Sequence, residues 1–263
     1  MIVWDVSPEI VTLGPITIRW YGVLYASAFL IGIKILQWIF KKEGKSSEDL
    51  NSLVLYLILG TIIGARLGHC LFYSPEFYLS NPLEIIKIWE GGLASHGGVI
   101  GIALAIYLYQ RKRKGQSFLW VCDRAAIPIS LAAMFIRIGN LFNSEIIGKP
   151  TDLPWSFVFV RDDNIPRHPA QLYEAFSYLI IFVFLTMIYK NNYKTIKDGL
   201  ITGLLFISVF TARFIIEFFK ENQSAFESAL PINMGQILSI PVVVIGIVIL
   251  IVIHKKKKVI KIE

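Results

Sequence analysis

The chain has 263 residues, of which 55% are hydrophobic and only 17% are charged, and its mean hydropathy is +0.60. A soluble domain of this length carries about a quarter charged residues, so the composition argues against a soluble protein. The formal net charge of +7 comes without a basic patch interleaved with aromatic residues. We therefore expect no nucleic-acid partner, and we assign the basic residues to the loops of a membrane protein.

Long apolar stretches divide the chain. A bilayer core of about 30 Å needs about 20 mostly apolar helical residues to cross it, and backbone groups in lipid must be bonded internally. Seven stretches qualify: 17–40, 50–73, 94–110, 117–139, 170–189, 199–219 and 235–253. The third is short and could extend back through Leu93. We predict an all-α, polytopic membrane protein with about seven transmembrane helices and a single domain, residues 1–263. No Lys or Arg precedes Arg19, so we expect the first span to be retained rather than removed as a signal peptide.

Lysine and arginine are distributed unevenly between the two sets of loops. Fifteen lie in segments 41–48, 111–114, 190–197 and 254–261, and six lie in the alternate loops. Cytoplasmic loops carry the excess of basic residues. We therefore predict an outside N-terminus, a cytoplasmic C-terminus and extracytoplasmic loops at about 74–93, 140–169 and 220–234.

Ionisable residues inside the predicted spans are costly, about 3 kcal/mol or more at the bilayer centre, and each is a candidate functional residue. We assign Lys34, Asp123 and Arg124 to structural roles, because each can reach the inner interface or form a pair. The remaining ones gather near the outer face, where other polar residues begin or end spans. This outer set contains Arg66, His69, Arg137, Asn140, Arg213, Glu217, His96, His168, Gln171 and Glu174.

Two interpretations of the outer set remain open. The polar groups could hold helices together, at about 1–2 kcal/mol per hydrogen bond. Alternatively, three arginines with too few buried carboxylates indicate a bound anion, and guanidinium is a preferred partner of phosphate. An anion reached from the outer leaflet is most simply a phospholipid headgroup. The glycines from Gly91 to Gly98 allow close approach of backbone to a ligand and leave amides free at a helix N-terminus.

Several motifs together resemble the bacterial phosphatidylglycerol–prolipoprotein diacylglyceryl transferase family. The most specific is the run from Arg137 to Glu145, RIGNLFNSE, followed by Gly148. The others are Trp20–Gly22, Gly64–Gly68, Gly91–Gly98, Arg167–Glu174, Arg213–Phe219 and Met234–Ser239. One position departs from the pattern: the family usually has tyrosine four residues before the arginine that corresponds to Arg213, where this chain has Val209.

The resemblance implies an enzyme that moves the diacylglyceryl group of phosphatidylglycerol to the lipobox cysteine of a preprolipoprotein signal peptide and releases glycerol phosphate. It also implies a bacterial cytoplasmic (inner) membrane location, with the active site toward the extracytoplasmic side. Membrane lipids are then the other expected partners. The reaction needs a thiolate, since a cysteine of pKa about 8.5 is mostly protonated at neutral pH. It also needs cations at the leaving phosphate.

We assign roles to the candidate residues on this basis. Arg137 and Arg213 form the phosphate clamp, while Asn140 and Gln171 orient headgroup oxygens. His96 is the preferred general base, with Glu145 and Tyr21 as rivals or helpers. Activation of the thiol by arginines alone, or a purely structural His96, remains open. Lipid-binding roles are also predicted for Gly98, Gly148 and Glu217, and Glu217 is expected to orient Arg213. Arg66 is a further candidate for lipid binding, but it could instead pair with a helix.

No cofactor is expected. The four histidines and two cysteines lack the spacing of metal ligands, and no HExxH sequence is present. The main alternative function is a transporter or channel for an anionic solute or lipid, which would place polar residues through both leaflets in inverted repeats. A retinal-binding receptor would need a lysine deep in the last span, and residues 235–253 contain none.

Overall fold

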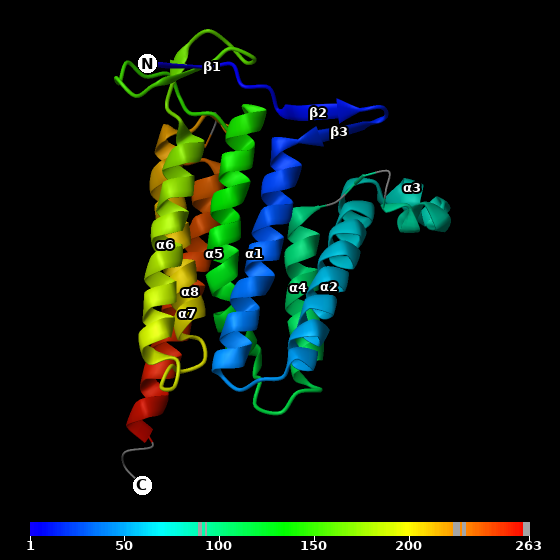
Figure 1. Cartoon of the computed structure of the whole chain (residues 1–263), viewed down its shortest axis with the longest axis vertical. Helices are drawn as coiled ribbons and strands as arrows, with labels where there is room; N and C mark the ends of the chain where they lie inside the picture. The colour runs from blue at the N-terminus through cyan, green and yellow to red at the C-terminus, as the bar shows by residue number, and fades with distance from the viewer. Residues whose placement is uncertain (89–90, 93, 223–226, 228–229, 260–263) are drawn as a thin grey trace. The chain divides into compact units, whose positions relative to one another are not determined.

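The structure is a computed structural model of the chain and describes residues 1–88, 91–92, 94–222, 227 and 230–259. Seven main helices correspond to the seven predicted stretches (Figure 1): α1 Trp20–Lys42, α2 Ser47–Tyr73, α4 Ser95–Gln110, α5 Phe118–Asn143, α6 Ala170–Asn192, α7 Leu200–Ile216 and α8 Met234–Val259. The prediction of a mostly helical, multi-pass membrane protein is confirmed. In the described part, six helices are long and apolar enough to cross a bilayer. The exception, α4, has 16 residues and is about 24 Å long; Leu93 lies outside the described residues.

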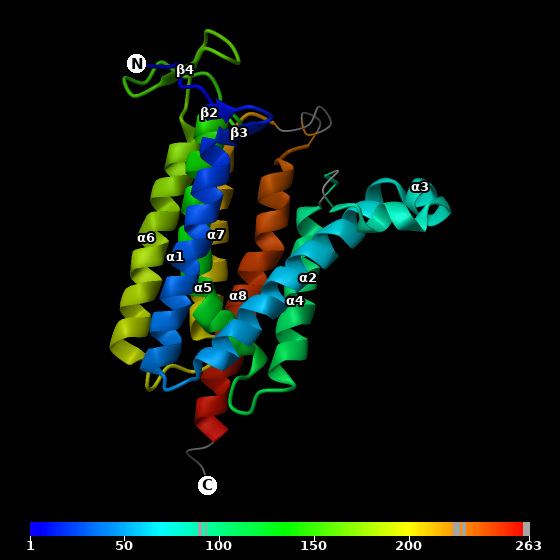
Figure 2. The ribbon, with the colours of Figure 1, turned by 45° about the vertical axis from the view of Figure 1, so that its right-hand side comes forward.

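The chain forms two compact units, one of residues 1–36 and 123–263 and the other of residues 37–122. The single domain predicted for residues 1–263 thus contains both. In the first unit, α6 packs on α7 and α7 packs on α8; Figure 2 gives a second view of the helices of this unit.

Short strands cover the end of the first unit that carries the N-terminus (Figure 1). Strand β1 (Ile2–Trp4) runs parallel to β4 (Phe157–Phe159), which pairs antiparallel with β5 (Pro166–Arg167). Strands β2 (Glu9–Leu13) and β3 (Ile16–Arg19) form a separate hairpin. Phe157 and Phe159 are buried with Leu141 at the end of α5, and the Trp4 indole donates a hydrogen bond to the Leu141 carbonyl at 3.0 Å. These contacts fix the end of α5, where the candidate site begins.

At the opposite end of this unit, Asp123 of α5 caps the N-terminus of α7. Its carboxylate accepts hydrogen bonds from the Gly199 amide (2.8 Å), the Thr202 amide (2.8 Å) and the Thr202 hydroxyl (2.6 Å). An N-terminal helix amide has no partner within its own helix, and a carboxylate there also favours the helix dipole. The side chain of Arg124 lies 3.7 Å from Asp198 and 3.9 Å from Asp123. These contacts agree with the structural roles assigned to both residues.

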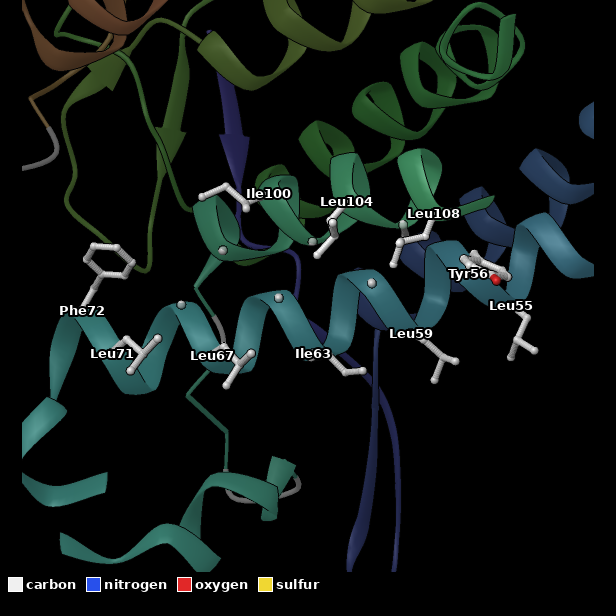
Figure 3. A pocket seen from close by; sticks show the side chains of 16 residues that line it. Leu55, Tyr56, Leu59, Ile63, Leu67, Leu71, Phe72, Ile100, Leu104 and Leu108 are labelled. Atoms are coloured by element: carbon white, nitrogen blue, oxygen red, sulfur yellow. The ribbon is translucent and has the colours of Figure 1, made fainter. Parts of the chain in front are cut away.

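The second unit is built on close contact between α2 and α4. Gly60, Gly64 and Gly68 face Gly97 and Gly101, and a Cβ on Gly64 would lie only 2.7 Å from the Cα of Gly101. Small residues of this kind let membrane helices approach closely. Larger side chains flank the contact and line an apolar groove of about 610 Å³ (Figure 3). Helix α3 (Pro75–Ser80) and the 3₁₀ helix η1 (Pro82–Ile86) follow α2.

Candidate active site

The last two turns of α5 carry the first pair of predicted site residues. Arg137 and Asn140 are three residues apart, so they share a helix face, and an Arg137 terminal nitrogen donates to Asn140 Oδ1 at 3.3 Å. The Arg137 Nε lies 3.0 Å from Oε2 of Glu174 on α6, whose side chain is fully buried. The resulting ion pair joins α5 to α6.

The turn after α5 places Glu145 between two residues with an unusual backbone conformation. Its neighbours Ser144 and Ile146 have φ values of 54° and 58°, which are uncommon for residues other than glycine and rare for a β-branched residue. Such strained residues concentrate at functional sites. The Glu145 carboxylate accepts from the amide groups of Asn140 at 3.1 Å and Asn143 at 3.2 Å.

Gln171 links this turn to α6. Its amide nitrogen donates to the Glu145 carbonyl at 2.7 Å, and its side chain is fully buried. That bond orients the amide, and its Oε1 atom then has no hydrogen-bond donor among the described residues. Contacts thus link Arg137 to Asn140, Asn140 to Glu145 and Glu145 to Gln171, and Glu174, three residues after Gln171 on α6, pairs with Arg137.

A second set of charges extends from Glu174. Lys220 is buried, with its ammonium 3.7 Å from Glu174 Oε1 and 2.7 Å from Glu217 Oε1. Arg213 Nε lies 3.4 Å from the same Glu217 oxygen. We call Arg137, Glu174, Lys220, Glu217 and Arg213 the ion-pair cluster. It brings together residues from the ends of α5, α6 and α7, and from the 3₁₀ helix η3 (Glu217–Phe219) and the residue after it.

Arg213 is the member of the cluster that is most available to a ligand. Its side chain is 32% exposed, and its two terminal nitrogens have no hydrogen-bond partner in the described part of the chain. Glu217 is held from the other side by Asn233, whose amide donates to Glu217 Oε2 at 3.1 Å. Glu217 therefore fixes the arginine while leaving its outer N–H groups free.

Two tyrosines flank the cluster. Tyr21 packs against Gly139, where a Cβ would lie 2.7 Å from the ring, and it is close enough to Glu145 and Arg137 to interact with their charges. Tyr178 is buried on α6, and its hydroxyl donates to Glu174 at 3.3 Å. It also interacts with both Arg137 and Arg213. Val209 lies one turn before Arg213 on α7, so Tyr178 brings a phenol to the two arginines in a chain that lacks one at position 209.

Gly148 lies where three backbone segments meet. Its amide donates to the His168 carbonyl at 3.1 Å, and its neighbour Lys149 donates to the Phe219 carbonyl at 2.8 Å. A Cβ on Gly148 would lie 2.8 Å from that same Phe219 oxygen. The structure thus gives Gly148 a packing role, and its predicted contact with lipid stays a prediction.

Arg167 stabilises the backbone at Gly148. It donates to the Gly148 carbonyl at 3.1 Å and to Glu221 at 2.8 Å, and its other side binds both oxygens of Asp163. Hydrogen bonds from Arg167 lower the pKa of Asp163, and those to Asp163 raise the already high pKa of Arg167. Burial lowers the pKa of the neighbouring His168, so we expect this imidazole to be neutral at pH 7.

In the second unit, Arg66 is engaged by backbone. Its side chain is buried, and it donates to the carbonyls of Glu84, Ile85, Gly91 and Gly92. It also lies over the Tyr78 ring. In this arrangement Arg66 holds the segment after α3 against α2, and its predicted contact with phosphate remains untested.

His96 occupies the first turn of α4 in the same unit. It is exposed, and the centroid of its ring lies 5.5 Å from that of Phe72 and 5.8 Å from that of Tyr73. His69 stacks on Tyr73. Neither His96 nitrogen has a hydrogen-bond partner among the residues described. Gly98 is buried close to Ala65 of α2. Gly98 thus has a packing role within the second unit, and the predicted roles of His96 and Gly98 in the reaction stay predictions.

Sequence reasoning did not find every member of the site. Glu174 was a candidate without a partner, and Lys220 was counted as an ordinary loop residue. The spacing of Lys220 three residues after Glu217 was the available signal, since residues so placed face one another on a helical turn. Tyr178 and Asn233 gave no signal of their own. Within the described residues, no group of three or more His, Cys, Asp and Glu is placed to hold a metal ion.

These features define a polytopic helical membrane protein with a buried, arginine-containing charge cluster at one end of its helices. Comparison with known proteins is more specific. The family model described as prolipoprotein diacylglyceryl transferase matches residues 8–252, and the chain belongs to this family, which confirms the resemblance.

Curated relatives named phosphatidylglycerol–prolipoprotein diacylglyceryl transferase cover nearly the whole chain. One from Chloroherpeton thalassium is 53% identical over 249 residues, which are 95% of this chain and 93% of the relative. One from Tolumonas auensis is 50% identical over 257 residues, or 98% and 99% of the two chains. One from Bacteroides fragilis is 44% identical over 268 aligned positions, with 97% and 96% coverage.

Proposed function

We propose that this protein transfers the sn-1,2-diacylglyceryl group of phosphatidylglycerol to the lipobox cysteine thiol of preprolipoproteins, the first step of lipoprotein maturation. The observation that carries the proposal is the ion-pair cluster, in which two arginines are held by buried carboxylates in a member of the diacylglyceryl transferase family. The substrates are phosphatidylglycerol and a signal peptide that carries the lipobox, and both are embedded in the membrane.

The reaction exchanges one bond at a glycerol carbon. The cysteine sulfur forms a C–S bond to the sn-3 carbon of the diacylglyceryl unit, and the C–O bond from that carbon to the phosphate breaks. The electron pair of the broken bond leaves with the phosphate, which becomes glycerol phosphate and gains negative charge. The thiol proton goes to a base. Catalysis therefore needs stabilisation of charge at the phosphate and removal of one proton from sulfur.

The arrangement of Arg213 suits the stabilisation of negative charge at the phosphate. Its free terminal nitrogens can donate two parallel hydrogen bonds to phosphate. Glu217, which is itself bound by Lys220, holds Arg213 in place. Arg137, fixed by Glu174, is the second cation of the proposed clamp. Oε1 of Gln171 would accept from a hydroxyl of the glycerol headgroup, because it is a buried acceptor that lacks a donor.

Three residues are candidates for the base that removes the proton from the cysteine thiol. His96 carries an imidazole, the side chain that most often acts as a general base, and it is exposed, but no hydrogen bond among the described residues orients it. Glu145, which is joined to Arg137 through Asn140, and Tyr21, which is close to both charges, remain its rivals or helpers. The proposed lipid-binding residues are Arg66 and Gly98 in the second unit and Asn140, Glu217 and Gly148 in the first.

We further propose that the protein lies in the bacterial cytoplasmic membrane with this site toward the extracytoplasmic side. Within the first unit, the ion-pair cluster lies at the helix ends near the N-terminus, and the basic segments 190–197 and 254–258 lie at the other ends (Figure 1). Basic residues mark the cytoplasmic side, so this distribution supports the orientation.

The test uses the purified full chain in detergent micelles with acyl-labelled phosphatidylglycerol and a synthetic lipobox peptide. We expect label on the peptide cysteine through a thioether, and at least about a 100-fold loss of rate in Arg213→Ala, as when one donor to a developing oxyanion is removed. Arg19→Ala is the matched control, since Arg19 is exposed and paired with Glu9 at the same end of the first unit. Full activity in both Arg137→Ala and Arg213→Ala would refute the clamp. Uptake of an anion into proteoliposomes without transfer would favour the transporter.

A further inference from the structure

Two hollows, which share Leu250 and His254, lie beside the C-terminal turns of α8, at the end of the first unit opposite the ion-pair cluster. One has a volume of about 470 Å³ and lies between Ile207 of α7 and Ile247 and Ile251 of α8, with His254 and Lys255 at its rim. The other, of about 410 Å³, lies between α8 and the turn that joins α6 to α7, and includes Lys197 and His254. Both volumes are within the range of about 300–1,000 Å³ that is typical of ligand sites.

The rim of the two hollows is basic and lacks carboxylates. Among the described residues, no Asp or Glu lies within ion-pair distance of Lys197, His254 or Lys255. The nearby Asp198 has Arg124 within 3.7 Å. The Lys197 ammonium is fixed by a hydrogen bond of 2.8 Å to the Ile253 carbonyl, which leaves two N–H groups for another acceptor. The charge at this rim is therefore uncompensated and partly preorganised.

We propose that these hollows bind one anionic phospholipid. The phosphate contacts Lys197, His254 and Lys255, and one acyl chain lies along Ile207, Ile247 and Ile251. Only an amphiphile charged at one end matches both an apolar wall and a basic rim, whereas a free inorganic anion leaves the apolar wall unused. In the proposed orientation the site faces the cytoplasmic leaflet, whose anionic lipids attract basic residues near the membrane.

This site is distinct from the candidate active site. Gly235 of α8 contacts Glu217 of the ion-pair cluster, and His254 follows 19 residues later in the same helix, about 29 Å along its axis. The lipid bound here is therefore not the one that reacts at the cluster.

Photo-crosslinking of the full chain tests the proposal. The probe is phosphatidylserine with a diazirine on one acyl chain, compared with phosphatidylcholine that carries the same group, in micelles at low ionic strength. We expect phosphatidylserine to label residues 247–251 about tenfold more strongly than phosphatidylcholine. Lys197→Gln and Lys255→Gln should each reduce that labelling about fivefold, the effect of one basic residue near a membrane surface.

Lys194→Gln is the matched control, because Lys194 lies in the same turn but outside both hollows. It should leave the labelling unchanged, and thermal unfolding in micelles should show that all variants are folded. Equal labelling by the two lipids would overturn the proposal, as would an equal loss in Lys194→Gln, since either result indicates ordinary boundary lipid or general surface charge. Absence of label from residues 247–251 would also overturn it.

Discussion

Replacing Lys220 by methionine removes the only described cation that lies between two buried carboxylates. Its ammonium is 2.7 Å from Glu217 and 3.7 Å from Glu174, and its side chain is 3% exposed. At an effective dielectric constant of about 20, these distances correspond to roughly 6 and 4–5 kcal/mol of gross attraction. Desolvation of the three charges offsets much of this, and loss of one partner of a buried pair typically costs 3–5 kcal/mol.

We therefore expect Lys220→Met to lower the free energy of unfolding by about 3–5 kcal/mol. For a chain of this size that is a fall of roughly 6–20 °C in Tm. Loss of the far-ultraviolet circular dichroism signal of the helices can follow unfolding in micelles. Lys220→Arg keeps the charge and should recover most of the loss, while Lys149→Met, at an exposed lysine, should change Tm by less than about 2 °C. Equal Tm values for Lys220→Met and Lys149→Met would refute the role of the buried lysine.

Three further predictions concern other parts of the fold. Gly64→Ala should destabilise the second unit by about 1–3 kcal/mol, because its Cβ would overlap the backbone of α4; Gly22→Ala, which has open space around it, is the control in the same thermal assay. Asp123→Asn should cost about 1–3 kcal/mol by removing the charged cap of α7, and an unchanged Tm would contradict this. His168 has a lowered pKa in the folded protein, so the unfolded state takes up its proton first. Stability should fall as pH drops below about 6.5, and His168→Gln should flatten that dependence in unfolding measured from pH 8 to 5.

The helices could be predicted from sequence because each depends mainly on a continuous apolar stretch of membrane length. The strands could not. They have two to five residues each, and β1 pairs with β4, which lies more than 150 residues further along the chain. Such pairing depends on tertiary contacts, here the packing of Trp4 against the buried cluster that includes Leu141 and Phe157, and leaves little trace in local pattern.

In the candidate site, too, contacts within one helix could be predicted from the sequence, whereas contacts between distant segments could not. Arg137 with Asn140, and Arg213 with Glu217, follow from helical spacing, and both pairs are within contact distance. Arg66 shows the limit of that reasoning. It was counted among arginines that lack partners, yet backbone carbonyls from the segment after α3 satisfy it. Carbonyl acceptors carry no signature in the sequence, because every residue has one.

The inference of a bound anion rested on arginines outnumbering their carboxylate partners, and the structure changes the basis of that inference. Glu174 and Glu217 each hold one arginine, which alone would leave the cluster neutral. Lys220 adds a third buried cation against the same two carboxylates, so one positive charge is again in excess. A buried charge without a partner is costly, and the free terminal nitrogens of Arg213 are the groups through which a phosphate would compensate it. The proposed anion site therefore depends on Lys220, a lysine that the sequence analysis had counted as a loop residue.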